Sequence, residues 1–380
     1  MSNSIEVKPV KSLAERRIFL DFPRIIYQND PLWVPPILSD LQKRLDPTQG
    51  VYFKRGGMAE FFIAWRHNTP VGTICIGEDP VINQQRGRKD CIFGFFESID
   101  DRMVSRALFD QAAVWGKRHN LDSLYGPFNL DYEDSYGILV EGWDRPPVLL
   151  CAHNPPYYQA LVEDYGFKKA RGDGLAFEVR LDQDNREIER IHHLAERLRK
   201  RRNFTIRQAN LADWDNEVER VFSVINRALE HLTDFIPWQR EAFYESLAQF
   251  KKIVDPEFIL LAEANGEVIG WFPGIPNLNE ALIHANGLHH PWDYLKLAWY
   301  MRKHPECLAV KSVLVLPEYW DTGVSVLLFD EMVTRLIGKG YSWVDLSVTA
   351  EDNPDTPILA ERVGARIYKR YRIYRYQLSN

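Results

Sequence analysis

A change of hydrophobic period near the C-terminal end constrains the fold most. Residues 310–316 form a short apolar run rich in β-branched side chains, which is typical of a strand that ends at Pro317. From Val324 to Ile337 the apolar residues recur every three or four positions, which predicts one buried face of a helix. Residues 320–323 then form a loop that leads into a helix N-terminus, where backbone amides can hold an anion. This geometry suits a pyrophosphate.

This strand, loop and helix resemble the Gcn5-related N-acetyltransferases (GNATs), in which an Arg/Gln-x-x-Gly-x-Gly/Ala loop holds the pyrophosphate of acetyl-CoA. Trp320 takes the first motif position, Gly323 the first glycine and Ser325 the final small residue. The resemblance implies acetyl-CoA or another acyl-CoA as co-substrate. The residues expected to bind it are Val313, Leu314, Val315, Gly323, Val324, Ser325 and Asn353.

Asp321 places a carboxylate in the loop where phosphate oxygens would lie. Aspartate is among the preferred N-cap residues, so we expect Asp321 to cap the helix that begins near Val324. In that role it competes with the cofactor for the same amides.

The same order of elements occurs twice in the chain. Asn154 and Asn353 are 199 residues apart, and Gly166 and Gly364 are 198 apart. A first strand and a hairpin return at nearly the same offset, which indicates duplication. We predict an α/β (α+β) fold of two tandem GNAT-like domains, each a mixed, mostly antiparallel sheet flanked by helices. The expected ranges are 1–183, a linking helix at 184–203, and 204–380.

Composition excludes several classes of function. The net charge is −6 and the pI is near 6.0, so a basic nucleic-acid footprint is not expected. The four cysteines lack metal-ligand spacing, so no metal is predicted and the thiols are expected to be buried and reduced. No apolar run approaches the ~20 residues of a membrane span, and the start lacks the apolar region of a signal peptide. We therefore expect a cytoplasmic protein without a membrane partner; the oligomeric state, a homodimer included, stays open.

The GNAT segment N-x-x-A-x-x-L-Y-x-x-x-G-F has a partial counterpart in each copy. The tyrosine of that segment, often the general acid of the family, falls on Ala360 in the second copy and on Val162 in the first. Neither residue can donate a proton. In the strand expected at 343–348, Asp345 and Ser347 lie on the side opposite to the apolar residues, so one of them can face the cleft.

The first copy is not expected to bind the cofactor in the standard way; the two roles left open for it are to bind the acceptor or to shape the cleft. Its loop at 99–103 has no glycine and places Asp100 and Asp101 at a helix N-terminus, where they repel phosphate. The later loop 126–137 interleaves carboxylates with aromatic rings, which suits an amine held by charge and cation–π contact. The alternative is a solvated acidic turn.

Glu97 lies at a strand end where the family often keeps a general base, and a solvated strand end is the alternative for it. The candidate catalytic residues are Glu97, Glu133, Asp134 and Asp345. The candidate acceptor-binding residues are Asn129, Tyr132, Tyr136, Asn154 and Tyr157.

Residues 292–300 form an aromatic helix with a single basic residue, Lys296, among its rings. Packing in the core or in an interface is therefore expected, rather than base stacking.

The leading functional prediction is transfer of an acetyl or other acyl group from acyl-CoA to the amine of a small molecule. A deprotonated amine attacks directly, and a carboxylate or water removes its proton. The alternative is a catalytically inactive GNAT-like module that binds a small molecule or regulates a partner, because one fold hosts several functions.

Overall fold

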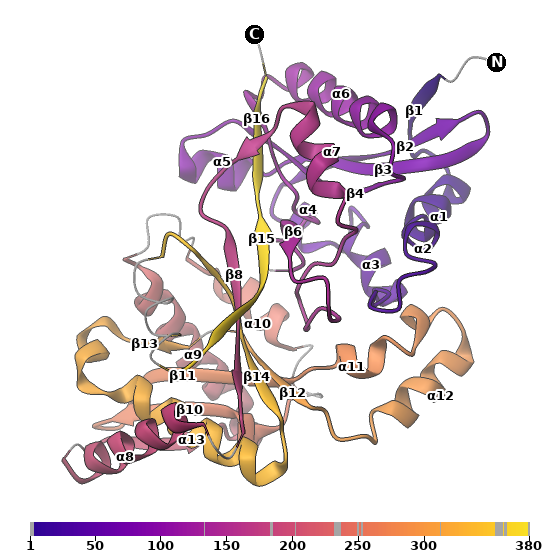
Figure 1. The fold of residues 1–380 in the computed structure, drawn as a ribbon. Helices are drawn as coiled ribbons and strands as arrows, with labels where there is room; N and C mark the ends of the chain where they lie inside the picture. Colours follow the sequence, from indigo (N-terminus) through magenta and orange to yellow (C-terminus); the bar gives the residue numbers. More distant parts are fainter. Residues whose placement is uncertain are drawn as a thin grey trace.

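The structure is a computed structural model of the chain. It describes residues 4–132, 134–182, 185–201, 203–231, 237–248, 251, 254–311, 313–353, 360 and 363–378. Two mixed sheets lie one above the other in Figure 1, joined by long strands that run from one to the other. This confirms the predicted fold class.

The first sheet has seven strands in the order β1-β2-β3-β4-β5-β16-β7, and only its β4–β5 pair is parallel. Its strands are β1 (Ile5–Pro9), β2 (Met58–Arg66), β3 (Thr69–Glu78), β4 (Asp90–Ser98), β5 (Ser123–Gly126), β16 (Tyr374–Gln377) and β7 (Lys168–Lys169). The helices of this half are α1 (Leu13–Asp21), α2 (Pro23–Ile26), α3 (Leu38–Arg44), α4 (Val51–Lys54), α5 (Pro80–Arg86), α6 (Arg102–Arg118) and α7 (Tyr158–Tyr165).

The second sheet follows the order β6-β15-β8-β14-β12-β11-β10-β9, with β13 paired to β11, and its β12–β14 pair is parallel. Its strands are β6 (Ile138–Glu141), β15 (Arg366–Arg372), β8 (Gly174–Arg180), β14 (Trp343–Ala350), β12 (Cys307–Val310), β13 (Leu314–Val315), β11 (Glu267–Pro276), β10 (Ile259–Ala264) and β9 (Thr205–Gln208). The helices of this half are α8 (Arg186–Arg201), α9 (Trp214–Leu229), α10 (Arg240–Ala248), α11 (Asn279–Leu282), α12 (Pro291–Tyr300) and α13 (Val324–Lys339).

The two copies exchange their last strands. β8 is the last strand of the first copy but pairs with β14 of the second sheet, and β16 is the last strand of the second copy but pairs with β5 of the first sheet. The two strands begin at Gly174 and Tyr374, so they are equivalent by the offset of the duplication. Figure 1 shows both running along the axis that joins the sheets. The two copies are therefore joined through both sheets, whereas the predicted domain limits stay a prediction.

Several predicted elements are found close to their expected positions. The hairpin that turns at Asn265-Gly266 is formed by β10 and β11, and both turn residues have positive φ (53° and 81°). The apolar face of α13 is buried, and the helix ends at Gly340 in the left-handed conformation. The apolar run at 310–316 is not one strand, because β12 ends at Val310 and the short β13 begins at Leu314. The four cysteines are buried free thiols, as expected.

Candidate active site

The strands β12 and β14 separate partway along their length. They pair in parallel through three positions, from Cys307↔Trp343 to Ala309↔Asp345. Beyond that point β13 pairs with β11 alone, while β14 pairs with β8 on its other side. The sheet therefore opens between β13 and the second half of β14. An extended ligand can lie in such an opening and bond to the free edge of β13.

The edge of β13 that faces the opening includes the Val315 carbonyl. The Leu316 amide donates to Ile269 of β11, so by the alternation of an antiparallel pair the peptide groups of Val315 point away from β11. The Val315 carbonyl accepts a hydrogen bond of 2.9 Å from Nε1 of Trp320. Thus Trp320, the residue at the first position of the motif, bonds to the strand predicted to hold the pantetheine.

The start of α13 has no capping side chain. Residues 317–322 form a 3₁₀ helix, and Gly323, with φ +87°, is the N-cap residue without a side-chain hydrogen bond to the first turn. The expectation that Asp321 caps α13 is wrong, because the left-handed Gly323 takes the N-cap position instead. The first-turn amides of α13 are thus not bonded by a cap side chain, and the helix dipole there favours an anion.

The linking helix α8 packs along α13. Arg199 forms an ion pair of 2.8 Å with the buried Asp330. A Cβ on Gly323 would lie 2.6 Å from Cδ1 of Leu198, and φ +87° disfavours any other residue there. Gly323 is therefore favoured by its backbone conformation, and the side chain of Leu198 on α8 would have to shift for any larger residue.

Asp345 lies where β12 and β14 begin to separate, and its side chain is fully buried. Its Oδ1 accepts a hydrogen bond of 2.8 Å from the hydroxyl of Tyr368, and its Oδ2 accepts one of 3.2 Å from the Ser347 amide. The Lys311 Nζ lies 3.9 Å from Oδ2. Burial raises the pKa of Asp345 above its ordinary value, while Lys311 and Tyr368 oppose the shift. A carboxylate with a raised pKa is suited to accept a proton.

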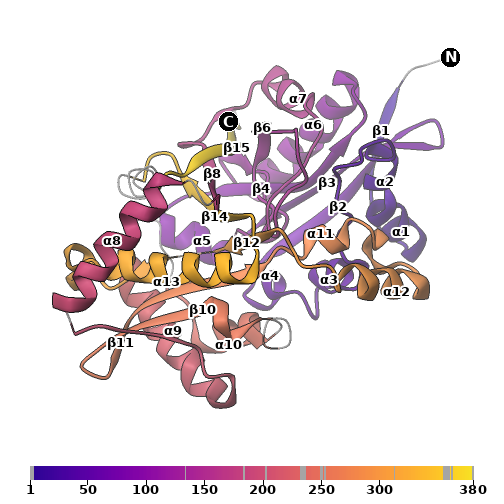
Figure 2. The same cartoon turned by 60° about the horizontal axis from the view of Figure 1, so that its bottom comes forward.

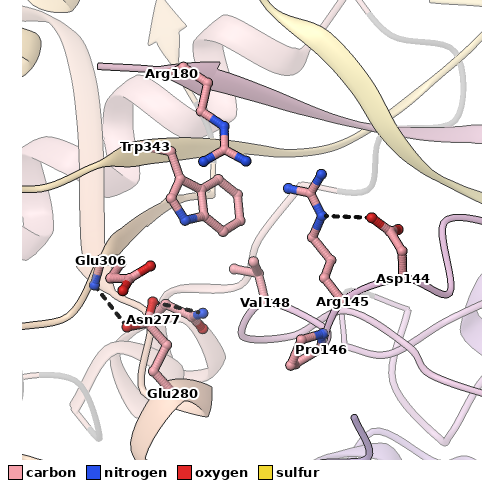
Figure 3. Close-up of a pocket in the computed structure, with 9 residues that line it drawn as sticks. All are labelled: Asp144, Arg145, Pro146, Val148, Arg180, Asn277, Glu280, Glu306 and Trp343. Atoms are coloured by element: carbon pink, nitrogen blue, oxygen red, sulfur yellow. Dashed lines mark hydrogen bonds and ion pairs between the residues drawn. The ribbon is translucent and has the colours of Figure 1, made fainter. Parts of the chain in front are cut away.

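A cavity of about 490 Å³ lies between the two copies on the same face of β14. Figure 3 shows the guanidinium groups of Arg145 and Arg180 directed toward the ring of Trp343. Trp343 is two residues before Asp345, so their side chains share one face of the strand. Arg145 also lies over the ring of Tyr368, at 4.9 Å. Tyr368 thus links Arg145 of the cavity lining to Asp345, which does not itself line the cavity. The residues that line the cavity are Asp144, Arg145, Pro146, Val148, Arg180, Asn277, Glu280, Glu306 and Trp343.

The corresponding opening in the first copy is filled by the chain itself. β4 and β5 also separate after three paired positions, but the Phe128 amide donates to the Phe93 carbonyl and Oδ1 of Asn129 accepts from the Phe95 amide, both at 2.7 Å. At the start of α6, the Asp101 side chain accepts from the Met103 amide at 2.8 Å and so caps the helix. Asn129 therefore helps to fill the opening between β4 and β5.

The hydroxyls of Tyr157 and Tyr158 close the end of β4. Tyr157 donates to the Ser98 carbonyl at 2.8 Å, while Tyr158 accepts from the Ser98 amide at 2.9 Å and donates to Glu97 at 2.6 Å. Tyr27 donates to the same carboxylate at 3.1 Å. Burial raises the pKa of Glu97 to about 7, although both tyrosine hydroxyls oppose the shift. The backbone edge that is open in the second copy is therefore bonded internally in the first.

The loop predicted to hold the acceptor amine is tied to its surroundings. Asp134 forms an ion pair with Arg44 and accepts a hydrogen bond of 2.7 Å from Ser135. Arg55 lies 5.6 Å from the ring centre of Tyr132, where an amine was expected. These contacts of Asp134 and Tyr132 are with Arg44, Ser135 and Arg55, and none of them is with Asp345.

The remaining predicted residues are placed as follows. Asn154 is buried and bonds to both the amide and the carbonyl of Leu139 in β6. Tyr136 is half-buried and packs in the core beneath the first sheet. The Asn353 amide donates to the Ala350 carbonyl at 3.0 Å, just past β14. Glu133 lies outside the described residues.

Sequence reasoning missed Tyr368 and Lys311. Tyr368 lies on β15, which reaches Asp345 only because both strands flank β8. No local signal in the sequence indicates this partner. Lys311 directly follows β12, and its place after an apolar strand was the one available signal.

Comparison with known proteins gives a family match for residues 221–365 and the fold of the whole chain. Residues 221–365 match the Acetyltransferase (GNAT) family. A bacterial ceramide synthase from Caulobacter vibrioides (strain NA1000 / CB15N) is 28% identical over 379 residues, covering 97% of each chain. Protein YghO from Escherichia coli (strain K12) is 28% identical over 371 residues, covering 95% of this chain and 93% of that one. A tandem GNAT protein from the clavulanic acid biosynthesis pathway shares the fold, with a TM-score of 0.56 and 13% identity over 99% of both chains.

Among the described residues, none of the helices is long and apolar enough to cross a membrane.

Proposed function

Because residues 221–365 form a domain of the GNAT family and the whole chain has the fold of a tandem GNAT protein, we propose that this protein transfers an acyl group from acyl-CoA to an amine. The observation that carries the proposal is the opening between β13 and β14 beside the uncapped start of α13. Acyl-CoA supplies an acyl group activated as a thioester.

The second copy is the proposed acyl-CoA site. The amides of Val324 and Ser325 at the start of α13 would bond to the pyrophosphate, since no side chain caps them. The edge of Val313–Val315 would bond to the pantetheine, and Asn353 lies past the end of β14. In the first copy the corresponding backbone groups are already hydrogen-bonded within the chain. The Asp101 side chain caps the first turn of α6, and the hydroxyls of Tyr157 and Tyr158 bond to the backbone at the end of β4.

Asp345 is the proposed general base. The amine nitrogen forms a C–N bond to the acyl carbon, the C–S bond breaks, and the amine proton passes to the Asp345 carboxylate. The departing thiolate takes a proton from water, because the family's tyrosine position is Ala360 here. Tyr368 orients the carboxylate through its 2.8 Å hydrogen bond. The acceptor would approach through the cavity lined by Arg145 and Trp343, and Tyr368 links this lining to Asp345 by its contacts with Arg145 and with the carboxylate. In the first copy, Glu97, Glu133 and Asp134 remain candidate catalytic residues.

The proposed acceptor is the primary amine of a long-chain amino alcohol. The ceramide synthase matches this chain over 97% of both lengths, and a ceramide is the amide of such an amino alcohol with a fatty acid. A long-chain acyl-CoA is accordingly the proposed donor.

The test is an acyl-transfer assay with palmitoyl-CoA or acetyl-CoA and either sphinganine or short primary amines, presented in detergent. The amide product is measured by mass spectrometry together with the released thiol. Asp345→Asn is expected to lower kcat about 10²–10⁴-fold, the range of a general base, while leaving the Kd for acyl-CoA unchanged.

Ser325→Glu tests the donor site, and Met103→Glu is its matched control. Both residues are second in their helices, α13 and α6. Ser325→Glu is expected to weaken acyl-CoA binding by charge repulsion, whereas Met103→Glu should leave it unchanged. Binding of acyl-CoA without amide formation for any amine would reject the enzyme and favour the binding module.

A further inference from the structure

The helix α12 exposes an apolar and aromatic face. Five large apolar side chains within ten residues are each at least half exposed: Trp292 (56%), Tyr294 (54%), Leu295 (73%), Trp299 (62%) and Met301 (50%). This excludes core packing for these five side chains and leaves packing in an interface, the other expected alternative, untested. The spacing i, i+3, i+7 puts Trp292, Leu295 and Trp299 on one side of the helix. That stripe faces solvent, the reverse of an ordinary surface helix.

The buried side of α12 is formed by other residues. Asp293 is fully buried and accepts a hydrogen bond of 3.0 Å from the His290 amide at the start of the helix. The ring of Tyr300 stacks on His284 at 3.8 Å. The helix is thus fixed in place by its polar and inner residues, and its exposed apolar stripe is not needed for packing within the chain.

The charges around this face are positive. Within residues 290–305 the charged residues are Lys296, Arg302, Lys303 and Asp293, a formal charge of +2 on a chain whose net charge is −6. Asp293 is buried, whereas Lys296, Arg302 and Lys303 are exposed. Tryptophan and tyrosine rings flanked by exposed Lys and Arg are the side chains that favour the boundary between lipid headgroups and acyl chains. Acidic lipid headgroups complement the exposed charges.

α12 is part of an arm that begins and ends at the cavity beside Asp345. Asn277 and Glu280 line that cavity before α12, and Glu306 lines it afterwards. Glu280 closes the base of the arm by accepting from the amides of Glu306 and Cys307 at 2.8 and 3.0 Å. Figures 1 and 2 both place α11 and α12 at the rim of the molecule, on the side of α3.

We propose that the exposed face of α12, formed by Trp292, Leu295 and Trp299 with the surrounding basic residues, docks on the surface of a bilayer that contains anionic lipids. The inference rests on the proposed function, since a long-chain acceptor resides in a membrane and the arm borders the proposed acceptor cavity. The helix lies in the interface and does not span it. The earlier expectation of no membrane partner rested on the lack of a spanning segment, which does not bear on interfacial docking.

The first test is sedimentation of the purified full chain with vesicles, without acyl-CoA. Vesicles of phosphatidylcholine with about 30% phosphatidylglycerol are compared with phosphatidylcholine alone. We expect the protein to sediment with the anionic vesicles, with tryptophan emission shifted to shorter wavelength, and binding to weaken in high salt. Failure of the wild type to sediment with either vesicle would overturn the proposal.

The variant W292S/L295S/W299S tests the face itself. It should reduce vesicle binding at least tenfold without a change in fold, because the three side chains are more than half exposed. The matched control V114S/L194S/I337S replaces three exposed apolar residues on α6, α8 and α13 and should bind as the wild type does. K296E/R302E/K303E should remove the preference for anionic vesicles. Equal binding by both triple serine variants would refute the docking face.

Two further measurements separate the alternatives. If the wild type is a dimer by light scattering and W292S/L295S/W299S is a monomer while neither sediments with vesicles, α12 is a self-association face and the proposal fails. In the acyl-transfer assay, the serine variant should keep the wild-type rate with detergent-presented amine and lose it with amine in vesicles. Absence of transfer in both forms would reject the proposed function alone, because vesicle binding is measured independently.

Discussion

The indole Nε1 of Trp320 donates a 2.9 Å hydrogen bond to the carbonyl oxygen of Val315. The two residues belong to the two parts of the proposed cofactor site, the loop before α13 and the edge of β13. Trp320 is 44% exposed, and its ring lies edge-on to His231 at 4.9 Å. Since Val315 belongs to the edge proposed for the pantetheine, the indole N–H and the cofactor compete for one acceptor.

Trp320→Phe is expected to strengthen CoA binding. The substitution keeps an aromatic ring but removes the N–H, so the Val315 carbonyl becomes available. A net hydrogen bond contributes about 0.5–1.5 kcal/mol, which corresponds to roughly a 2- to 13-fold lower Kd by calorimetry. Trp214→Phe, on α9, serves as a control for loss of an indole and should leave the Kd unchanged. A weaker affinity in Trp320→Phe would mean that the indole contributes to binding rather than opposing it.

Asp321→Asn is expected to strengthen CoA binding at low salt. The carboxylate does not cap α13, so its removal should change the free energy of unfolding by less than about 0.5 kcal/mol. Loss of a negative charge near a pyrophosphate removes repulsion that salt also screens, and the gain should therefore shrink between 50 mM and 500 mM salt. Titration calorimetry at the two salt concentrations measures this. A gain that is independent of salt would exclude an electrostatic origin.

Gly323 is a poor position for blocking the cofactor. Its φ of +87° and the approach of Leu198 mean that a side chain there strains the backbone and clashes with α8. Loss of binding in Gly323→Glu would therefore not separate a blocked site from a disturbed fold. Ser325, two residues later, is the appropriate position.

The free energy of unfolding of the first copy should fall as the pH rises, because Glu97 loses a proton that the folded state holds. Its pKa is about 7 in the folded chain against an ordinary value of 4.5, so the native state binds the extra proton. This stabilisation is fully present below pH 4.5 and is lost as the pH rises through 7, about 3 kcal/mol in total. Glu97→Gln keeps a neutral side chain at every pH, and its free energy of unfolding should decline less between pH 5 and 8.

Urea denaturation across that pH range measures the difference. Glu60→Gln, which replaces an exposed glutamate on β2, is the control and should follow the wild type. Parallel curves for wild type and Glu97→Gln would show that Glu97 is ionised in the native state throughout.

The strand exchange predicts that both copies unfold together. Arg375 on β16 forms an ion pair with the buried Asp90 of β4 and donates to Ser123 of β5 at 2.8 Å. Arg375→Met leaves Asp90 without its partner, which costs about 3–5 kcal/mol. Calorimetry should show one transition for the wild type and one transition at lower temperature for the variant. Two transitions of which only one shifts would indicate that the copies unfold independently.

Local features of the fold were predictable from the sequence, and long-range pairing was not. The Asn265-Gly266 turn specifies its hairpin within a few residues, and the period of 324–337 specifies the buried face of α13. In contrast, β8 has the same alternation whether it pairs with its own copy or with β14. The exchange depends on contacts between residues more than 160 positions apart, which no local pattern encodes.

The candidate site was predictable to the same extent. The alternation of β14 singled out Asp345, because that signal lies within one strand. Its partner Tyr368 is on another strand, and the pair forms only through the shared neighbour β8. The cap at Asp321 was predicted from residue preference alone, and the left-handed backbone at Gly323 overrode it. The sequence predicted that the aromatic residues of α12 pack in the core or in an interface. It could not predict their exposure, because an apolar period does not say on which side of a helix the core lies.

The central claim is that acyl-CoA binds at the start of α13 and not at the start of α6. Hydrogen–deuterium exchange of the full chain, with and without saturating CoA, compares the two sites in one experiment. We expect CoA to slow exchange at the amides of Val324, Ser325 and Val326, and to leave the amides of Met103 and Val104 unchanged. Protection at the start of α6 alone, or none at either helix at saturating CoA, would contradict the account.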